Sequence, residues 1–186
     1  MTWDGLKPPY RTIVADPPWL YKPTGNAPHP RGGGWSGYEV GNPPPYSMMT
    51  PAEIAALPVG ELAGESAHLY LWTTNRHLPA AFDVAKAWGF RYSQTLTWCK
   101  VPMGRGLGGA FVNTTEFVLF CRRGRLAHQD RLDTTWWQWK RQGHSVKPQA
   151  FIDVVEQVSP GPYVELFARA PRLGWDAWGY GYEVAS

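Results

Sequence analysis

Hydrophobic and polar positions along the chain follow two rhythms, one typical of buried strands and one typical of helices. Short runs of β-branched, aromatic and aliphatic residues predict strands, which we place at residues 12–15, 68–73, 91–100, 116–121 and 163–168. Apolar side chains recur every three or four positions over 78–88 and 148–158, which predicts two helices. A shorter helix over 50–57 is predicted from Thr50 as cap, Pro51 after it and Glu53 at the capping-box position.

Strands that alternate with helices predict an α/β fold with a mostly parallel sheet flanked by helices. Such sheets bind ligands beyond the carboxyl ends of their strands. Two segments stand at such ends: residues 16–19 (Asp-Pro-Pro-Trp) follow the first predicted strand, and Ala168-Arg169 follow the last. The length of 186 residues fits a single domain over 1–186, and we detect no internal repeat.

Irregular backbone takes up much of the chain, since 20 residues are Gly and 18 are Pro. We predict long loops over 22–47, 101–112 and 122–143, acting as substrate loops or lids. The Gly-rich run 104–109 precedes a strand rather than opening a helix, so it does not fit a dinucleotide fingerprint. With Arg105 it fits a substrate loop better.

The sequence also excludes several classes of protein. No run approaches the ~20 apolar residues that span a bilayer, and the N-terminus has no apolar signal region. Cys99 and Cys121 have no spacing typical of metal or redox sites. We therefore expect a cytoplasmic protein with no membrane contact and no bound metal.

Positive charge is concentrated in one part of the chain. Residues 100–147 hold nine basic side chains against three acidic ones, although the formal net charge of the chain is only +3. Trp136, Trp137 and Trp139 lie within this stretch. Basic and aromatic side chains together can pair phosphates and stack bases, which indicates contact with nucleic acid. The alternative is a solvated loop with three partly buried indoles.

The residues Asp16, Pro17, Pro18 and Trp19 can perform a specific chemistry. The exocyclic amine of adenine is a poor nucleophile, because its lone pair is delocalised into the ring. A carboxylate and a rigidly held carbonyl can accept its two N–H bonds and orient the nitrogen toward a methyl donor. An adjacent indole can stack on the base. The alternative is a turn that only ends a strand. A similar run, Asn42-Pro-Pro-Pro-Tyr46, follows no strand, and we interpret it as loop.

Further motifs follow in order along the chain. They are LYLWTTNR at 69–76, LTWCK at 96–100, NTTE at 113–116, HSVKP at 144–148, SPGPYVELFAR at 159–169 and GWDAWG at 174–179. With the DPPW motif, they make roughly residues 10–180 resemble the MT-A70-like family of S-adenosylmethionine-dependent adenine N6-methyltransferases, above all its short bacterial and bacteriophage members.

The resemblance implies a Rossmann-like fold in which DPPW precedes the cofactor-binding strand, and N6-methylation of adenine in nucleic acid, with DNA favoured over RNA. It implies that Asp16 and the Pro17 carbonyl hold the amine, next to Pro18 and Trp19. The residues implied in S-adenosylmethionine binding are Asp16, Lys147, Glu165, Phe167, Arg169 and Gly179. Those implied in substrate binding are Trp19, Tyr21, Asn75, Lys100, Arg105, Asn113 and Glu116.

Other interpretations stay open at this point. Lys147 could be a solvated charge before a helix, Arg169 a strand-end salt-bridge residue, and Glu165 could face a basic loop. The chain could also be an inactive nucleic-acid-binding subunit of the same fold, or methylate a small molecule or a protein amide. Larger family members carry an acidic residue on a strand before DPPW, and its absence here predicts weak cofactor binding. With no target-recognition domain visible, we expect relaxed specificity, a homodimer or a separate partner subunit.

Overall fold

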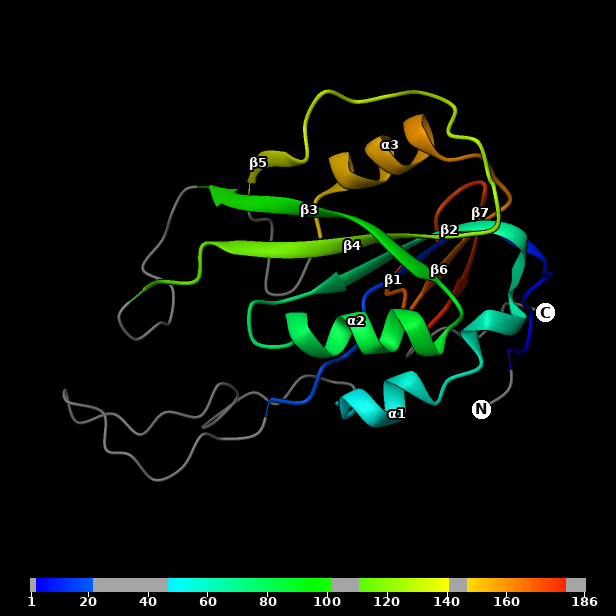
Figure 1. The fold of residues 1–186 in the computed structure, drawn as a ribbon, viewed down its shortest axis with the longest axis horizontal. Coiled ribbons are helices and arrows are strands. Elements are labelled where there is room, and N and C mark those ends of the chain that lie inside the picture. The colour runs from blue at the N-terminus through cyan, green and yellow to red at the C-terminus, as the bar shows by residue number, and fades with distance from the viewer. Residues whose placement is uncertain (1–2, 22–46, 102–110, 141–146, 180–186) are drawn as a thin grey trace.

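The computed structural model describes residues 3–21, 47–101, 111–140 and 147–179. These residues form one seven-stranded sheet with helices on both faces (Figure 1). The strands are β1 (Tyr10–Ala15), β2 (Ala63–Thr73), β3 (Arg91–Val101), β4 (Thr115–Arg123), β5 (Trp136–Lys140), β6 (Tyr163–Leu166) and β7 (Trp175–Trp178). The helices are α1 (Pro51–Ala55), the 3-10 turn η1 (Val59–Glu61), α2 (Leu78–Ala87) and α3 (Gln149–Val158).

The strand order is β5-β3-β4-β2-β1-β6-β7. In the part of the sheet that is described, β4 is antiparallel to both β2 and β3, and the other paired strands are parallel. This is the Rossmann-like, mostly parallel sheet that the sequence predicts. The chain adds β2 on one side of β1 and returns much later to add β6 on the other side. The carboxyl end of β1 therefore lies at a switch in strand order, where α/β sheets bind ligands.

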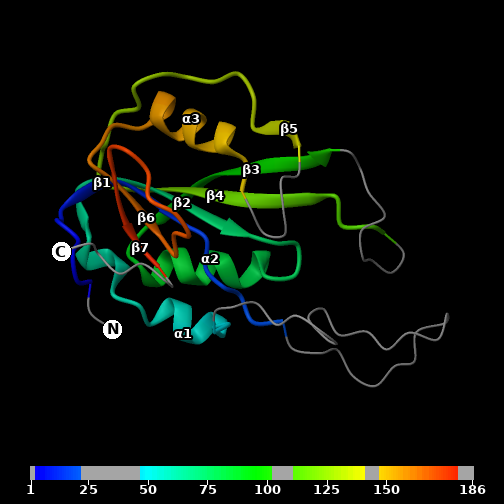
Figure 2. The ribbon, with the colours of Figure 1, turned by 180° about the vertical axis from the view of Figure 1, so that it is seen from behind.

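Helices α1 and α2 cover one face of the sheet and α3 covers the other, as the front and back views both show (Figures 1 and 2). Alternation along β1 supplies both cores, because successive strand residues point to opposite faces. Ile13 and Ala15 join the core beneath α1 and α2, whereas Val14 joins the core beneath α3. In β2, Leu71 and Trp72 divide in the same way. Both faces of the central strands are therefore buried.

The helix ends that local sequence signals predict are confirmed. Thr50 and Glu53 form the expected reciprocal capping box at the start of α1. Gly89, after α2, has φ 82°, a left-handed conformation that favours glycine and stops the helix. Within the described residues, no helix is long and apolar enough to cross a membrane, and no cluster of three His, Cys, Asp or Glu side chains could hold a metal ion.

Two strands were missed by the sequence prediction. The predicted loop over 122–143 begins inside β4 and contains β5, so it is wrong as a continuous loop. β5 is short, and three indoles in five residues obscure its alternation. β7 pairs with β6 at the other edge, so β6 is not the last strand. The predicted loops over 22–47 and 101–112 fall mostly outside the described residues.

Candidate active site at the carboxyl edge of the sheet

Four charged side chains form a continuous row at the carboxyl edge of the sheet. The ammonium nitrogen of Lys147 donates to both carboxylate oxygens of Asp16, at 2.8 and 2.7 Å. It also lies 3.4 Å from Glu116, whose other oxygen is 2.5 Å from the ammonium of Lys100. Opposite charges thus alternate along the row from Lys100 through Glu116 and Lys147 to Asp16. We call these four residues the charged row.

The fold brings the charged row together from four distant segments. Asp16 directly follows β1, and Lys100 lies near the end of β3. Glu116 is near the start of β4, and it reaches the same edge because β4 is antiparallel to its neighbours. Lys147 lies two residues before α3 and places its ammonium 5.0 Å from the ring centre of Trp72. The indole contributes a cation–π contact, which favours the charged form of the lysine.

Burial and charge oppose each other in this row, and charge prevails. Burial alone would raise the pKa of Glu116, but Lys147 and Lys100 outweigh it and hold the pKa below its usual value. Burial would likewise lower the pKa of Lys147, but Asp16 and Glu116 outweigh it and raise the pKa. Both groups are therefore ionised at neutral pH. A polar site of this kind can orient a ligand without changing its own protonation state.

The two prolines form a rigid turn after Asp16. The Pro17 carbonyl accepts the Trp19 N–H at 2.9 Å, and the Pro18 carbonyl accepts the Met49 N–H at 2.8 Å. A carbonyl oxygen has two lone pairs, so the Pro17 oxygen can accept a second hydrogen bond. Neither proline can donate from its nitrogen, so the backbone of the two prolines takes part in hydrogen bonds only through its carbonyl acceptors.

Trp19 lies in the wall beneath this turn. It is only 5% exposed, its indole N–H donates to the Trp72 carbonyl at 3.0 Å, and its ring stacks on His77 at 5.4 Å. Tyr21 contacts the edge of the same imidazole at 4.6 Å and donates from its hydroxyl to Thr74. These rings form a packed aromatic layer under the acceptors. Stacking of a base on Trp19 stays a prediction.

On the other side of β1, the ends of β6 and β7 meet closely. Phe167 follows β6 with φ 63°, an uncommon conformation for a bulky residue. Its ring contacts Trp178 edge to face at 5.6 Å. The next residue, Ala168, donates its N–H to the Trp178 carbonyl at 3.0 Å. A Cβ at Gly179 would collide with the backbone of Ala168, so only glycine fits there without movement.

Glu165 supplies a second carboxylate next to this junction. Its oxygen lies 3.7 Å from a guanidinium nitrogen of Arg172. Burial raises the pKa of Glu165, Arg172 partly opposes that rise, and the nearby charge of Asp16 adds to it. Asp16 and Glu165 are therefore close enough to influence each other across the paired strands β1 and β6.

Comparison with known proteins identifies the family. Residues 10–181 match the family model described as MT-A70. The chain belongs to the MT-A70 family. It is similar to the type II methyltransferase M.MunI from Mycoplasma sp, with 29% identity over 190 residues that cover 91% of this chain and 76% of that protein. It is also similar to an N(6)-adenosine-methyltransferase MT-A70-like protein from Drosophila melanogaster, with 26% identity over 172 residues. That match covers 88% of this chain but only 25% of the fly protein.

In this MT-A70 chain, the remaining predicted site residues are placed as follows. Asn75 is exposed after β2, and its amide donates to Thr115 at 3.4 Å. Asn113 is exposed just before β4, and Arg169 is exposed after β6. These three lie at the carboxyl edge but outside the charged row. Arg105 falls outside the described residues, and its role stays a prediction.

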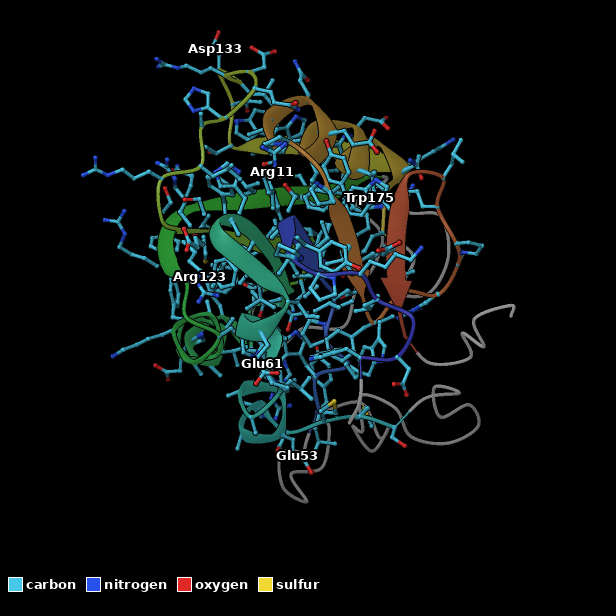
Figure 3. All side chains as sticks on the ribbon, turned by 90° about the vertical axis from the view of Figure 1, so that its right-hand side faces the viewer. Arg11, Glu53, Glu61, Arg123, Asp133 and Trp175 are labelled. Carbon is cyan, nitrogen blue, oxygen red and sulfur yellow. The ribbon has the colours of Figure 1, made fainter. Side chains whose placement is uncertain are left out.

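The described basic residues of the stretch over 100–147 lie at different places on the sheet, and contact of this stretch with nucleic acid stays a prediction. Lys100 and Lys147 belong to the charged row and pair with carboxylates. Arg122 and Arg123 lie at the far end of β4, because that strand runs away from the site. Figure 3 views the molecule from that opposite edge, where Arg123 and Arg11 are labelled.

The sequence analysis missed three residues that shape the site. His77 stacks on Trp19, and its ring nitrogen contacts the Leu20 carbonyl at 3.1 Å. Burial lowers the pKa of His77, so the ring stays neutral. The Trp72 ring contacts Lys147, and Arg172 contacts Glu165. The position of His77 in the TTNRH run after a buried strand was the available signal, whereas only the fold reveals the other two.

Proposed function

We propose that this chain transfers a methyl group from S-adenosylmethionine to the N6 amine of adenine in nucleic acid, with DNA favoured over RNA. The observation that carries the proposal is the position of Asp16. Its carboxylate stands at the carboxyl end of the central strand β1, beside the Pro17 carbonyl and fixed by Lys147. Membership of the MT-A70 family supports adenine as the base, because one similar protein is named for N(6)-adenosine methylation.

The side chains between β1 and β6 fit S-adenosylmethionine by their chemistry. Asp16 and Glu165 offer acceptors for the ammonium and ribose hydroxyl groups of the cofactor, and Lys147 offers a cation for its carboxylate. The Nε of Arg172 is buried and has no hydrogen-bond partner among the described residues, which leaves a donor beside Glu165. We assign Phe167, Arg169 and Gly179 to the same side, where the junction of β6 and β7 borders the site.

The protein's own contribution is to position and orient the amine. S-adenosylmethionine, when bound, supplies an electrophilic methyl group on a positively charged sulfur. Asp16 accepts one N–H of the amine and the Pro17 carbonyl accepts the other, so that the nitrogen lone pair points out of the base plane. Asp16 can do this while bound to Lys147, because a carboxylate offers about four acceptor positions.

Bond changes in the reaction balance without a strong base. S-adenosylmethionine held by Asp16, Lys147 and Glu165 would supply the methyl group to the amine nitrogen, and the electron pair of the broken carbon–sulfur bond would stay on sulfur. The nitrogen then carries a positive charge and releases one proton to water. Asp16 stabilises this charge as it develops, which is the electrostatic part of catalysis. Because N6 of a paired adenine is out of reach, the substrate is single-stranded or has its adenine flipped out.

The decisive experiment compares Asp16→Asn with the wild type, using labelled methyl donor on single- and double-stranded DNA and RNA, followed by nucleoside analysis. We expect N6-methyladenine with the wild type and a rate about 10²–10³-fold lower with the variant. Asp83→Asn on the exposed side of α2 is the matched control and should keep full activity. Unfolding midpoints of all three proteins establish that each is folded.

Three results would contradict the proposal. Full activity of Asp16→Asn would remove the assigned role of the carboxylate. A wild-type protein that binds nucleic acid but methylates none of the four substrates would instead support an inactive binding subunit. Methyl transfer to a small molecule or protein amide alone would support the third interpretation.

A further inference from the structure

The edge strand β5 (Trp136–Lys140) contains three tryptophans, and the proposed reaction uses none of them. It is the terminal strand of the sheet and pairs with β3 on one side. Its residues alternate between exposed and partly buried along the strand. The side chain of Trp136 is 55% exposed to solvent, which is a high fraction for so large an apolar side chain. An exposed indole offers a flat face on which a base can stack.

The two faces of β5 have different roles. Trp137 and Trp139 stack in parallel on the face toward α3, with ring centres 5.3 Å apart, and Trp139 contacts Phe151 of α3. Trp139 also accepts the indole N–H of Trp98 at its carbonyl oxygen. These contacts fix the strand in place. Trp136 and Lys140 point to the other face and are exposed.

β5 is placed to continue the site across the sheet. Trp98 of β3 pairs with Glu116 on one side and with Trp137 on the other. Neighbouring strands lie about 4.8 Å apart, so β5 is about 10 Å from the strand that carries Glu116. Lys100 of the charged row pairs with Trp139. Lys100 and Trp139 share the face toward α3, so a polymer held at the charged row passes over the edge strand to reach Trp136 and Lys140 on the other face.

The chemistry of β5 selects one kind of polymer. Between residues 136 and 140 the strand has a cation and no carboxylate, so it complements an anionic ligand. Trp136 offers a flat apolar face, and Lys140 lies about 13 Å further along the strand toward the carboxyl edge. Bases stack on indoles in a sequence-tolerant way, and lysine pairs with phosphate.

We infer that β5 binds unpaired nucleotides flanking the target adenine, with Trp136 stacking on a base and Lys140 contacting a phosphate. This inference rests on the proposed function for the identity of the target base. It makes single-stranded nucleic acid the preferred substrate, because the bases of a duplex are stacked on each other and closed to Trp136. It also predicts that longer oligonucleotides bind more tightly than the single nucleoside.

Fluorescence anisotropy with a labelled single-stranded 12-nucleotide DNA containing one adenine tests the inference on the full-length protein. We expect Trp136→Ala to weaken binding about 5- to 100-fold without changing the slope of log affinity against log salt concentration. Lys140→Gln should reduce that slope by about 0.7, the value for one phosphate contact on a single strand. Tyr92→Ala is the matched control, because Tyr92 is 45% exposed at the opposite end of β3.

The outcomes separate this inference from the proposed function. Unchanged affinity of Trp136→Ala in an otherwise active enzyme overturns the inference alone. A second outcome is that Trp136→Ala weakens binding and the wild-type protein methylates nothing. This outcome supports β5 as a nucleic-acid contact and overturns the proposed reaction. If sedimentation shows that Trp136→Ala breaks a dimer while affinity is unchanged, the edge joins two copies of the chain and the inference is wrong.

Discussion

Lys147 is the central link of the charged row, and its removal gives the sharpest test of that row. Lys147→Met keeps an unbranched apolar side chain of similar length, so packing against Trp72 is largely preserved. What the variant loses is the cation between Asp16 and Glu116. Two carboxylates then face each other and, among the described residues, Lys100 is the cation still paired with Glu116.

The expected cost follows from the burial of these groups. The side chains of Lys147, Asp16 and Glu116 are 20%, 20% and 16% exposed. Breaking a fully buried ion pair costs about 3–5 kcal/mol, and an exposed pair is worth about 0.2–1 kcal/mol. Groups that are four-fifths buried fall between these limits. We expect Lys147→Met to lower the free energy of unfolding by about 2–3 kcal/mol at pH 7.

The cost should also depend on pH. The pKa of Glu116 is lowered in the folded protein, so its ion pairs stabilise the fold above about pH 4.5 and lose their effect as the pH falls through the lowered value. Once Glu116 is protonated, it no longer needs the positive charge of Lys147. The difference between Lys147→Met and the wild type should therefore shrink as the pH falls through the lowered pKa of Glu116.

Urea unfolding at pH 7 and pH 3.5 measures both effects. A double-mutant cycle with Asp16→Asn isolates the pair, and we expect a coupling of about 1–2 kcal/mol. Lys86→Met, at an exposed position of α2, is the control and should change stability by less than about 0.5 kcal/mol. A coupling near zero, or a cost that is the same at both pH values, would refute the description of the row as a cooperative ionic unit.

Two further variants test other parts of the fold. His68 is 1% exposed, and burial lowers its pKa to about 4. Below about pH 6.5 the unfolded chain binds a proton that the folded protein excludes, so the free energy of unfolding falls by about 3 kcal/mol between pH 6.5 and 4. His68→Phe should remove this fall. If urea titrations give the same dependence of unfolding free energy on pH for the variant and the wild type, the prediction is wrong. Gly179→Ala should lower the free energy of unfolding by about 1–3 kcal/mol, because the added Cβ meets the backbone of Ala168. An unchanged thermal unfolding midpoint would contradict this prediction, since it would mean that the backbone between β6 and β7 adjusts without cost.

The sequence predicted the central part of this structure because the relevant signals are local. A β-branched run before Asp16 predicted a buried strand that ends at the site, and β1 is that strand. Thr50, Glu53 and Gly89 predicted helix ends through hydrogen bonding and backbone conformation within a few residues. The resemblance to the MT-A70 family supplied residues that the fold does bring to one edge of the sheet.

Other features depend on strand direction and were not predicted. β4 follows β3 along the chain and pairs with it antiparallel. That direction brings Glu116 into the charged row and carries Arg122 and Arg123 to the far edge. The contact between Lys147 and Asp16 joins residues 131 positions apart, so no local pattern could indicate it. β5 and β7 were not predicted, because short edge strands have too few residues to show a clear alternation of polar and apolar positions.

The central position of β1 has a consequence for how the protein is made. One side of β1 pairs with β2 early in the chain, but its other side pairs with β6, about 150 residues later. At about 5–20 residues per second, synthesis leaves this apolar strand with an open edge for roughly 8–30 seconds. An open apolar edge invites pairing with other chains. Slower translation of the last third of the chain lengthens this interval and is therefore expected to increase aggregation.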